Sequence, residues 1–242
     1  MHRHMIKEKY SNRTIATTMS SQRKTSLVAG ILYLLTFVSI PTLSIYSMVK
    51  SANYIVGPGP DTSALIGAVL EVIVALAGIG TAVALYPVVK KQNEGLALGF
   101  VASRTLEAAG IIASVACILT IVTLRQTGAG AGALLISQTL VALYDRLFLL
   151  SGSLMPAING LLLGSLLYRS RLVPRILPLV GLIGAPLLLA GDTAVLFGLI
   201  GRVSPLAGIL ALPIALWEFS LGIWLVVKGF NKSSVTLLEA KK

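Results

Sequence analysis

The stretch Phe100-Val-Ala-Ser-Arg104-Thr-Leu-Glu107-Ala-Ala-Gly110 lies inside an apolar run that extends over residues 96–124. About 20 apolar residues are enough for a helix to cross a bilayer, so this run predicts a transmembrane span. Arg104 and Glu107 are three positions apart, which places them on one face of that helix, where they can pair. An isolated charge at membrane depth costs ~2.5 kcal/mol or more, so both side chains should face protein or water. We therefore expect other helices to surround this pair.

The composition places the whole chain among membrane proteins. Of its 242 residues, 55% are hydrophobic and only 12% are charged, and the mean hydropathy is +0.87. Soluble domains carry about 25% charged residues, so a soluble chain of this size could not bury so much apolar surface. The single cysteine, Cys117, lies in the middle of an apolar run and can form no disulfide within the chain. The fold class that we predict is all-α, a polytopic transmembrane helical bundle.

Six apolar runs, separated by short polar or glycine-rich segments, predict six membrane spans. They cover residues 26–49, 63–89, 95–124, 147–168, 176–200 and 205–227. The first run is too long for the apolar core of a signal peptide, so we expect an uncleaved helix that bends at Pro41. Residues 133–144 should form an interfacial helix or lengthen the fourth span at its outer end. In the fourth span, Gly160-x-x-x-Gly164 favours close helix packing.

The spans define one membrane domain over residues 26–230, between two basic tails. Residues 1–25 predict a disordered N-terminal tail, because they are polar and basic. Within it, residues 1–18 are a candidate start-site extension ahead of Met19. Residues 231–242 predict a basic C-terminal tail.

The distribution of lysine and arginine predicts the orientation of the chain. Fifteen of these residues fall on one side of the predicted spans, and Arg104 lies within the membrane. The other side has four, namely Lys50, Arg125, Arg146 and Arg202. Because cytoplasmic loops carry the excess of positive charge, both termini should be cytoplasmic, in a multi-pass protein of the plasma membrane. The net charge of +11 is then a topology signal, so we expect the lipid bilayer and no nucleic acid as partner.

Short motifs spread along the chain resemble one protein family. They are Ala29-Gly-Ile-Leu-Tyr33, the Arg104-x-x-Glu107 pair, Tyr168-Arg-Ser-x-x-x-Pro174-Arg175, Gly184-Ala-Pro186 and Pro213-x-x-x-Trp217-Glu218…Trp224-Leu-x-x-Lys228-Gly-Phe230. Together they resemble the bacterial membrane family catalogued as domain of unknown function 4386, and the resemblance spans about residues 23–230. The resemblance implies a compact helical membrane domain, and it brings no activity, ligand or catalytic residue.

Five ionisable residues and one amide inside the predicted spans form the candidate polar cluster. They are Arg104, Glu107, Glu218, Glu71, Asp192 and Asn159. Counted along ideal helices, Glu107 and Glu218 fall near mid-membrane, with Glu71 and Asp192 in the outer third. Arg104 should contact at least one carboxylate, with Glu107 as the local partner and Glu218 as the distant one. Four carboxylates beside one guanidinium cannot all be ionised cheaply at low dielectric constant, so protons, cations or a water-filled cavity should accompany them. Asn159 is more often a contact between helices than a ligand.

Three classes of function remain open from the sequence. A non-enzymatic membrane module, such as a scaffold or sensor, needs the fewest assumptions, and the Arg104 cluster would then be a structural clasp. The alternative is a small proton- or cation-coupled transporter, with a small ion or solute as its partner, because acids at stepped depths suit a proton or cation path. We expect no enzyme, cofactor or metal site, since the spans hold no catalytic set and the only histidines are His2 and His4. An acid-lined, water-accessible cavity at mid-membrane would favour transport, and a dry interior would favour the scaffold.

Overall fold

The computed structural model describes residues 20–57, 60–128, 130 and 132–240, so the candidate extension over residues 1–18 lies outside the described part. All regular structure in these residues is helical, and no strand occurs among them. The helices are α2 (Ser21–Leu35), α3 (Thr42–Val49), the short η1 (Tyr54–Val56), α4 (Thr62–Val89), α5 (Glu94–Gln126), α6 (Ala133–Phe148), η2 (Leu149–Ser153), α7 (Leu154–Ser170), α8 (Ile176–Leu196), α9 (Pro205–Val227) and α10 (Lys232–Glu239).

Five of these helical stretches are long and apolar enough to cross a membrane, counting only the described residues. They are α4, α5, the continuous stretch of α6 to α7, α8 and α9. The prediction of an all-α membrane bundle is confirmed at this level. The first predicted span, over residues 26–49, does not appear as a helix of spanning length.

That first predicted span is divided into two helices. α2 ends at Leu35, residues 36–41 form tight turns, and α3 begins at Thr42. Pro41 has no N–H to continue the hydrogen bonds of α2, and it disfavours helical backbone at the residue before it. The interruption therefore occurs where the bend was predicted, but it is a break rather than a bend. At the other end, residues 21–25 belong to α2 and not to the predicted N-terminal tail.

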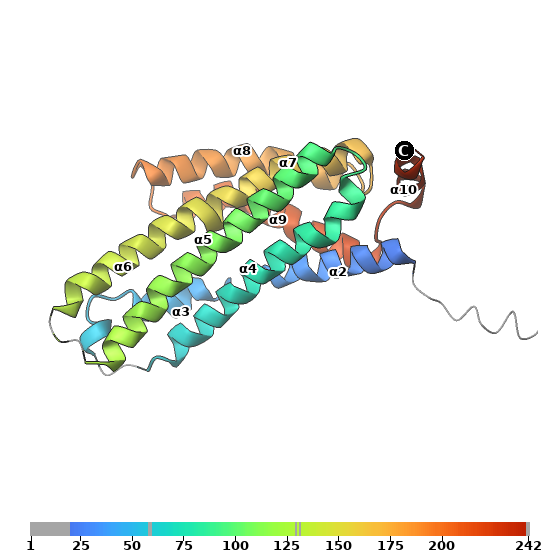
Figure 1. The fold of residues 1–242 in the computed structure, drawn as a ribbon. Helices are drawn as coiled ribbons and strands as arrows, with labels where there is room; N and C mark the ends of the chain where they lie inside the picture. Colours follow the sequence, from blue (N-terminus) through green and yellow to red (C-terminus); the bar gives the residue numbers. More distant parts are fainter. Residues whose placement is uncertain (1–19, 58–59, 129, 131, 241–242) are drawn as a thin grey trace, which may run out of the picture.

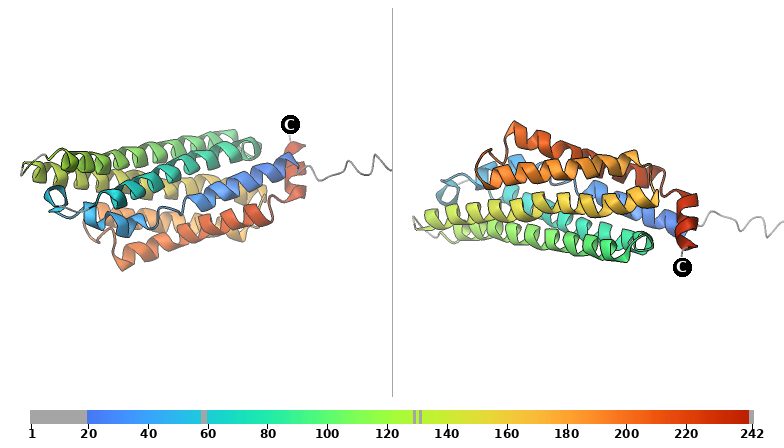
Figure 2. Two further views of the ribbon diagram at one scale, coloured as in Figure 1. Left: turned by 90° about the horizontal axis from the view of Figure 1, so that it is seen from below. Right: turned by 90° about the horizontal axis from the view of Figure 1, so that it is seen from above.

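Six helices close into a ring. α2, α4, α5, α7, α8 and α9 each pack on the next in chain order, and α2 closes the ring by packing on both α4 and α9 (Figure 1). Figure 2 shows α2 between α4 and α9 when the bundle is viewed from below. The closing contact is tight, because a Cβ at Gly30 would lie 2.7 Å from the carbonyl oxygen of Gly222. Side chains from all six helices can therefore meet inside the ring.

The fourth predicted span is longer than its apolar core. α6 and α7 form one helical stretch from Ala133 to Ser170, joined by a π-helical segment at Leu149–Ser153. Residues 133–144 thus lengthen the span at its N-terminal end, as one of the two predicted alternatives has it. In α7, a Cβ at Gly160 would lie 2.7 Å from the Ile214 side chain, and one at Gly164 would lie 3.2 Å from Leu182. The packing interpretation of these glycines is confirmed.

Both described ends of the chain lie at the same end of the bundle (Figures 1 and 2). The Gln22 amide, near the start of α2, donates to Glu239 Oε1 at the end of α10 over 3.1 Å. α10 lies within the predicted C-terminal tail, yet it packs on the domain, because Val235 and Leu238 are buried in the main core. We call this end of the molecule the basic end, since it holds Arg23, Lys24, Lys90, Lys91, Arg169, Arg171, Arg175, Lys228 and Lys232.

Candidate functional site

Arg104 is the centre of a buried cluster inside the ring. It lies ten residues after Glu94, the first residue of α5, which corresponds to a rise of about 15 Å along the helix. Asn93 caps the start of that helix by accepting from the Leu96 amide. The Arg104 side chain is 1% exposed. A guanidinium buried this completely needs carboxylate partners, because removing a charge from water is costly.

Two glutamates on different helices provide those partners. Arg104 Nη1 lies 3.0 Å from Glu107 Oε2 on the same helix, and Nη2 lies 2.5 Å from Glu218 Oε1 on α9. Both expected partners of Arg104, the local one and the distant one, are therefore confirmed as contacts. The guanidinium joins α5 to α9 across the interior of the ring.

Two more helices contribute to the cluster. The Asn159 amide on α7 donates to Glu107 Oε2 over 2.6 Å. The centre of the Tyr33 ring, on α2, lies 5.3 Å from the Arg104 guanidinium carbon, and that of the Phe100 ring lies 5.8 Å from it. Tyr33 belongs to the motif at residues 29–33, but the sequence alone did not predict that its ring contacts Arg104.

The two remaining acids of the predicted cluster bind neutral hydroxyl groups instead of Arg104. Tyr144 on α6 donates to Glu71 Oε1 over 2.6 Å, and Ser153 donates to Asp192 Oδ1 over 2.7 Å. The second carboxyl oxygen of Asp192 is buried without a hydrogen-bond partner. Of the six predicted residues, four form one cluster, and Glu71 and Asp192 form separate hydrogen-bonded sites.

A cavity of about 260 Å³ lies directly against the Arg104 cluster. Its polar wall is formed by Arg104, Glu107, Glu218 and Glu71, and the Ser153 hydroxyl that binds Asp192 also lines it. One water occupies about 30 Å³ of liquid, so the space exceeds that of a few waters. The break between α2 and α3 and the π-helical segment also contribute residues to the lining.

A second pocket, of about 530 Å³, adjoins this cavity on the side away from the basic end. The two share five lining residues, namely Ser39, Ile40, Phe148, Gly152 and Ala211. The second pocket reaches a group of charges that we call the rim: Lys50, Asp145 and Arg202. Asp145 Oδ1 lies 2.7 Å from Lys50 Nζ and 2.5 Å from Arg202 Nη1. Burial lowers the pKa of Lys50, and the neighbouring Asp145 opposes that shift.

A further ion pair lies beyond the rim, where the start of α4 meets the end of α5. We call this region the tip. Asp61, just before α4, pairs with Arg125 and accepts from the Tyr54 hydroxyl over 2.6 Å. The hydrogen bond from Tyr54 and the bonds from Gln126 and Arg125 hold the pKa of Asp61 below its ordinary value. Burial raises the pKa of Tyr54 to about 12. These contacts are local to the tip and separate from the cavity.

The fold and the buried cluster define the class of this molecule, a multi-pass helical membrane protein with an ionisable cluster in its interior. A family model described as "Domain of unknown function (DUF4386)" matches residues 28–229. The chain belongs to this family, and the resemblance drawn from its motifs is confirmed. No curated protein and no solved structure matches the chain.

Proposed function

We propose that this protein is a small, non-enzymatic transporter coupled to protons or small cations, which enter the cavity at Arg104 from the outer side of the plasma membrane. The observation that carries the proposal is the acid-lined cavity, which adjoins the pocket that reaches the rim. A scaffold whose only purpose is to clasp helices gains nothing from an open cavity beside its ion pair. The transporter therefore accounts for the cavity better than the dry module that the sequence favoured.

The charge of the cavity wall favours a cation. Glu71, Glu107 and Glu218 face one guanidinium, that of Arg104. α2 ends one residue before Thr36, which lines the cavity, so the partial negative charge of a helix C-terminus adds to that of the acids. Interrupted helices whose C-terminal ends point at the ion are a recurrent feature of ion-coupled transporters. A proton or a small cation compensates the excess of negative charge.

The side of the cavity that faces the basic end is closed by packing. The core includes fully buried residues that lie nearer the basic end than the cluster does along α4, α5, α7 and α9, namely Leu85, Ala97, Leu167 and Leu225. The arrangement corresponds to an outward-facing conformation, open at the rim and sealed below the Arg104 cluster. Transport would then require the ring to open on the other side.

The orientation is part of the proposal. Both described ends of the chain lie at the basic end, and the rim and tip at the opposite end carry Lys50, Arg125 and Arg202. The excess of positive charge supports a cytoplasmic location for both termini. α2, residues 36–41 and α3 together would then form the sixth crossing, as an interrupted span.

The test is charge displacement in proteoliposomes on a solid-supported membrane. A step in external pH, or in Na⁺ or K⁺ concentration, should give a transient current in wild-type vesicles, because a cation that enters the cavity moves through part of the membrane field. Glu218→Gln should abolish the current, and Glu94→Gln, which changes an exposed acid at the start of α5, should leave it unchanged. If wild-type vesicles respond no more than empty liposomes to all three ions, the transporter proposal is wrong and the scaffold or sensor stands.

A further inference from the structure

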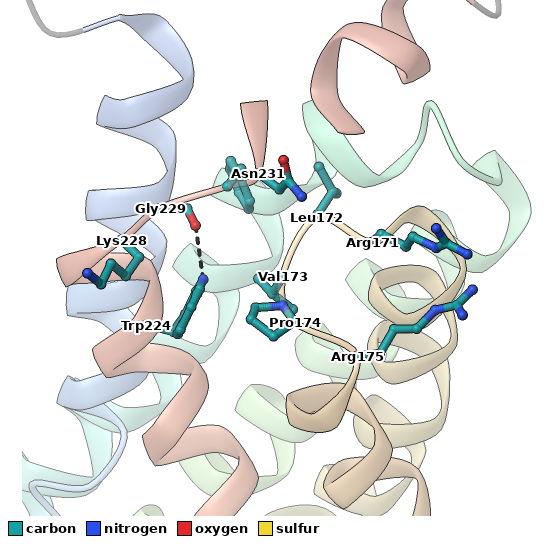
Figure 3. Close-up of a pocket in the computed structure, with 10 residues that line it drawn as sticks. Arg171, Leu172, Val173, Pro174, Arg175, Trp224, Lys228, Gly229 and Asn231 are labelled. Carbon is teal, nitrogen blue, oxygen red and sulfur yellow. Dashed lines mark hydrogen bonds between the residues drawn. The ribbon is translucent and has the colours of Figure 1, made fainter. Parts of the chain in front are cut away.

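A pocket of about 610 Å³ opens at the basic end, away from the cavity at Arg104. It lies between the connection from α7 to α8 and the connection from α9 to α10 (Figure 3). We infer that this pocket binds the phosphate headgroup of an anionic phospholipid, through Arg171 and Arg175. The inference concerns a second site and goes beyond the proposed transport function.

The pocket carries positive charge, and no carboxylate is among the described residues that line it. Arg171, Arg175 and Lys228 are exposed, and none of them forms a salt bridge within the part of the chain that the structure describes. Glu239, at the end of α10, is already engaged by Lys91 over 3.1 Å. A neighbouring pocket shares Arg171 and Arg175 and adds Arg169. Arginine forks favour phosphate because they can donate two parallel hydrogen bonds to it.

The two connections that form the pocket are held together by hydrogen bonds. The backbone N–H of Asn231 donates to the Leu172 carbonyl over 2.8 Å, and the Ser234 hydroxyl donates to the Arg171 carbonyl over 2.9 Å. Arg171 itself has left-handed backbone with φ 55°, which is uncommon for a residue with a side chain. Figure 3 shows Arg171 and Arg175 extending to the same side of the pocket, whereas Lys228 extends away from them beyond Trp224. The two arginines are thus carried by a backbone that these hydrogen bonds hold in place.

The apolar part of the pocket favours a lipid over a free anion. Trp224, Pro174 and Phe230 line it, and the Trp224 indole donates to the Gly229 carbonyl over 3.1 Å. Directly beside the pocket, Ile176 at the start of α8 is 63% exposed and Val227 at the end of α9 is 61% exposed. Tryptophan is typical of the interface between headgroups and acyl chains. Basic pockets between helices on the cytoplasmic side are where anionic headgroups bind, and acyl chains would follow the exposed apolar residues.

The test uses the purified full-length protein in detergent and follows its melting temperature. Three probes are compared: dioleoylphosphatidylglycerol, dioleoylphosphatidylcholine with the same chains, and inorganic phosphate. A ligand that binds only the folded state raises the melting temperature as its concentration rises. Phosphatidylglycerol should raise it in a saturable way, and the other two probes should not. An equal response to phosphatidylcholine would overturn the inference, and an equal response to inorganic phosphate would mean a site for a soluble anion.

A charge-matched pair of double variants locates the site. Arg171→Gln with Arg175→Gln should weaken the apparent affinity for phosphatidylglycerol about tenfold or more, because two charge-assisted contacts are lost. Lys24→Gln with Lys232→Gln removes the same charge from exposed positions at the same end, outside the pocket, and should leave the affinity nearly unchanged. Equal effects of the two variants would show only general electrostatic attraction and would contradict the assignment. If the arginine double variant fails to fold, the Arg175→Gln and Lys232→Gln single variants are compared instead. Only Arg175→Gln should weaken the apparent affinity for phosphatidylglycerol.

Discussion

The Arg104 guanidinium has a carboxylate on its own helix, Glu107, and another on α9, Glu218. Asn159 fixes Glu107 from a third helix by donating to its Oε2. Each carboxylate alone can become neutral by taking up a proton, whereas arginine stays charged. Removing the arginine therefore leaves groups that can become neutral, whereas removing both glutamates leaves a charge that cannot. The loss of both glutamates should be the most damaging change in the cluster.

The first prediction concerns coupling between the two glutamates. Glu107→Gln or Glu218→Gln alone leaves Arg104 one carboxylate, so each should lower stability modestly. The double variant leaves a buried, uncompensated charge, which typically costs about 3–5 kcal/mol. It should lose clearly more than the two single losses added together. The measurement is a double-mutant cycle: the free energy of unfolding in detergent is compared for the wild type, the two single variants and the double variant.

Two controls accompany that cycle. Arg104→Leu leaves two acids that can be protonated, so it should be tolerated better than the double glutamine variant. Glu94→Gln removes an exposed acid from the same helix and should change stability little. Strictly additive losses at Glu107 and Glu218 would show that Arg104 does not depend on the pair.

Part of this cluster could be predicted from the sequence at the level of single residues. The spacing of Arg104 and Glu107 on one helical face and the depth of Glu218 were sufficient to expect both contacts. The pairing of Asn159 with Glu107, and of Tyr144 with Glu71, could not be predicted, because it depends on how α6 and α7 rotate about their axis. The spacing of polar residues cannot predict this rotation for helices that are apolar on every side.

At the scale of elements, the interrupted first span and the close contact of α2 with α9 determine the shape of the interior. Gly30 in α2 lies against the Gly222 carbonyl and the Val226 amide of α9, both of which are backbone groups that cannot rotate away. α2 would have to move out of the ring to accommodate a side chain at this position. The ring would then open where it is closed in the structure.

The second prediction compares two glycine substitutions. Gly30→Ala should destabilise the protein, because its Cβ would lie 2.7 Å from the Gly222 oxygen. Gly208→Ala, within α9, meets nothing within 4 Å and should be neutral or stabilising by up to about 1 kcal/mol, since alanine favours helix. Melting temperatures of the two variants in the same detergent measure the difference. If Gly30→Ala melts no lower than Gly208→Ala, the close contact of α2 and α9 is not present.

The element boundaries illustrate what sequence patterns predict less well. Pro41 indicated an interruption of the first span, but the end of α2 at Leu35 did not follow from it, because residues 36–40 are themselves compatible with helix. The fourth predicted span began at residue 147, just after Asp145 and Arg146. The helix instead continues through both, and Asp145 is paired with Lys50 and Arg202 at the rim. Such long-range pairs are not visible in hydropathy.

At the scale of the whole molecule, the ring encloses an acid-lined cavity that adjoins the rim pocket, and the packed core lies toward the basic end. The central claim of the proposed function is that cations reach the Arg104 cluster from the outer side. Ser39 lines both pockets and is partly exposed, so it marks the path. Ser114, on α5, is fully buried and lines neither pocket, so it serves as the matched control.

The most direct measurement is cysteine labelling in oriented vesicles, with Cys117→Ser as the background. Membrane-impermeant methanethiosulfonates with a trimethylammonium or a sulfonate group are applied to one side at a time. Ser39→Cys should react from the side opposite the termini, and faster with the cationic reagent, because the acids attract positive charge. Ser114→Cys should not react from either side. Labelling of Ser39→Cys only from the side of the termini, no labelling at all, or a faster reaction with the sulfonate would contradict the outward-open, cation-attracting cavity.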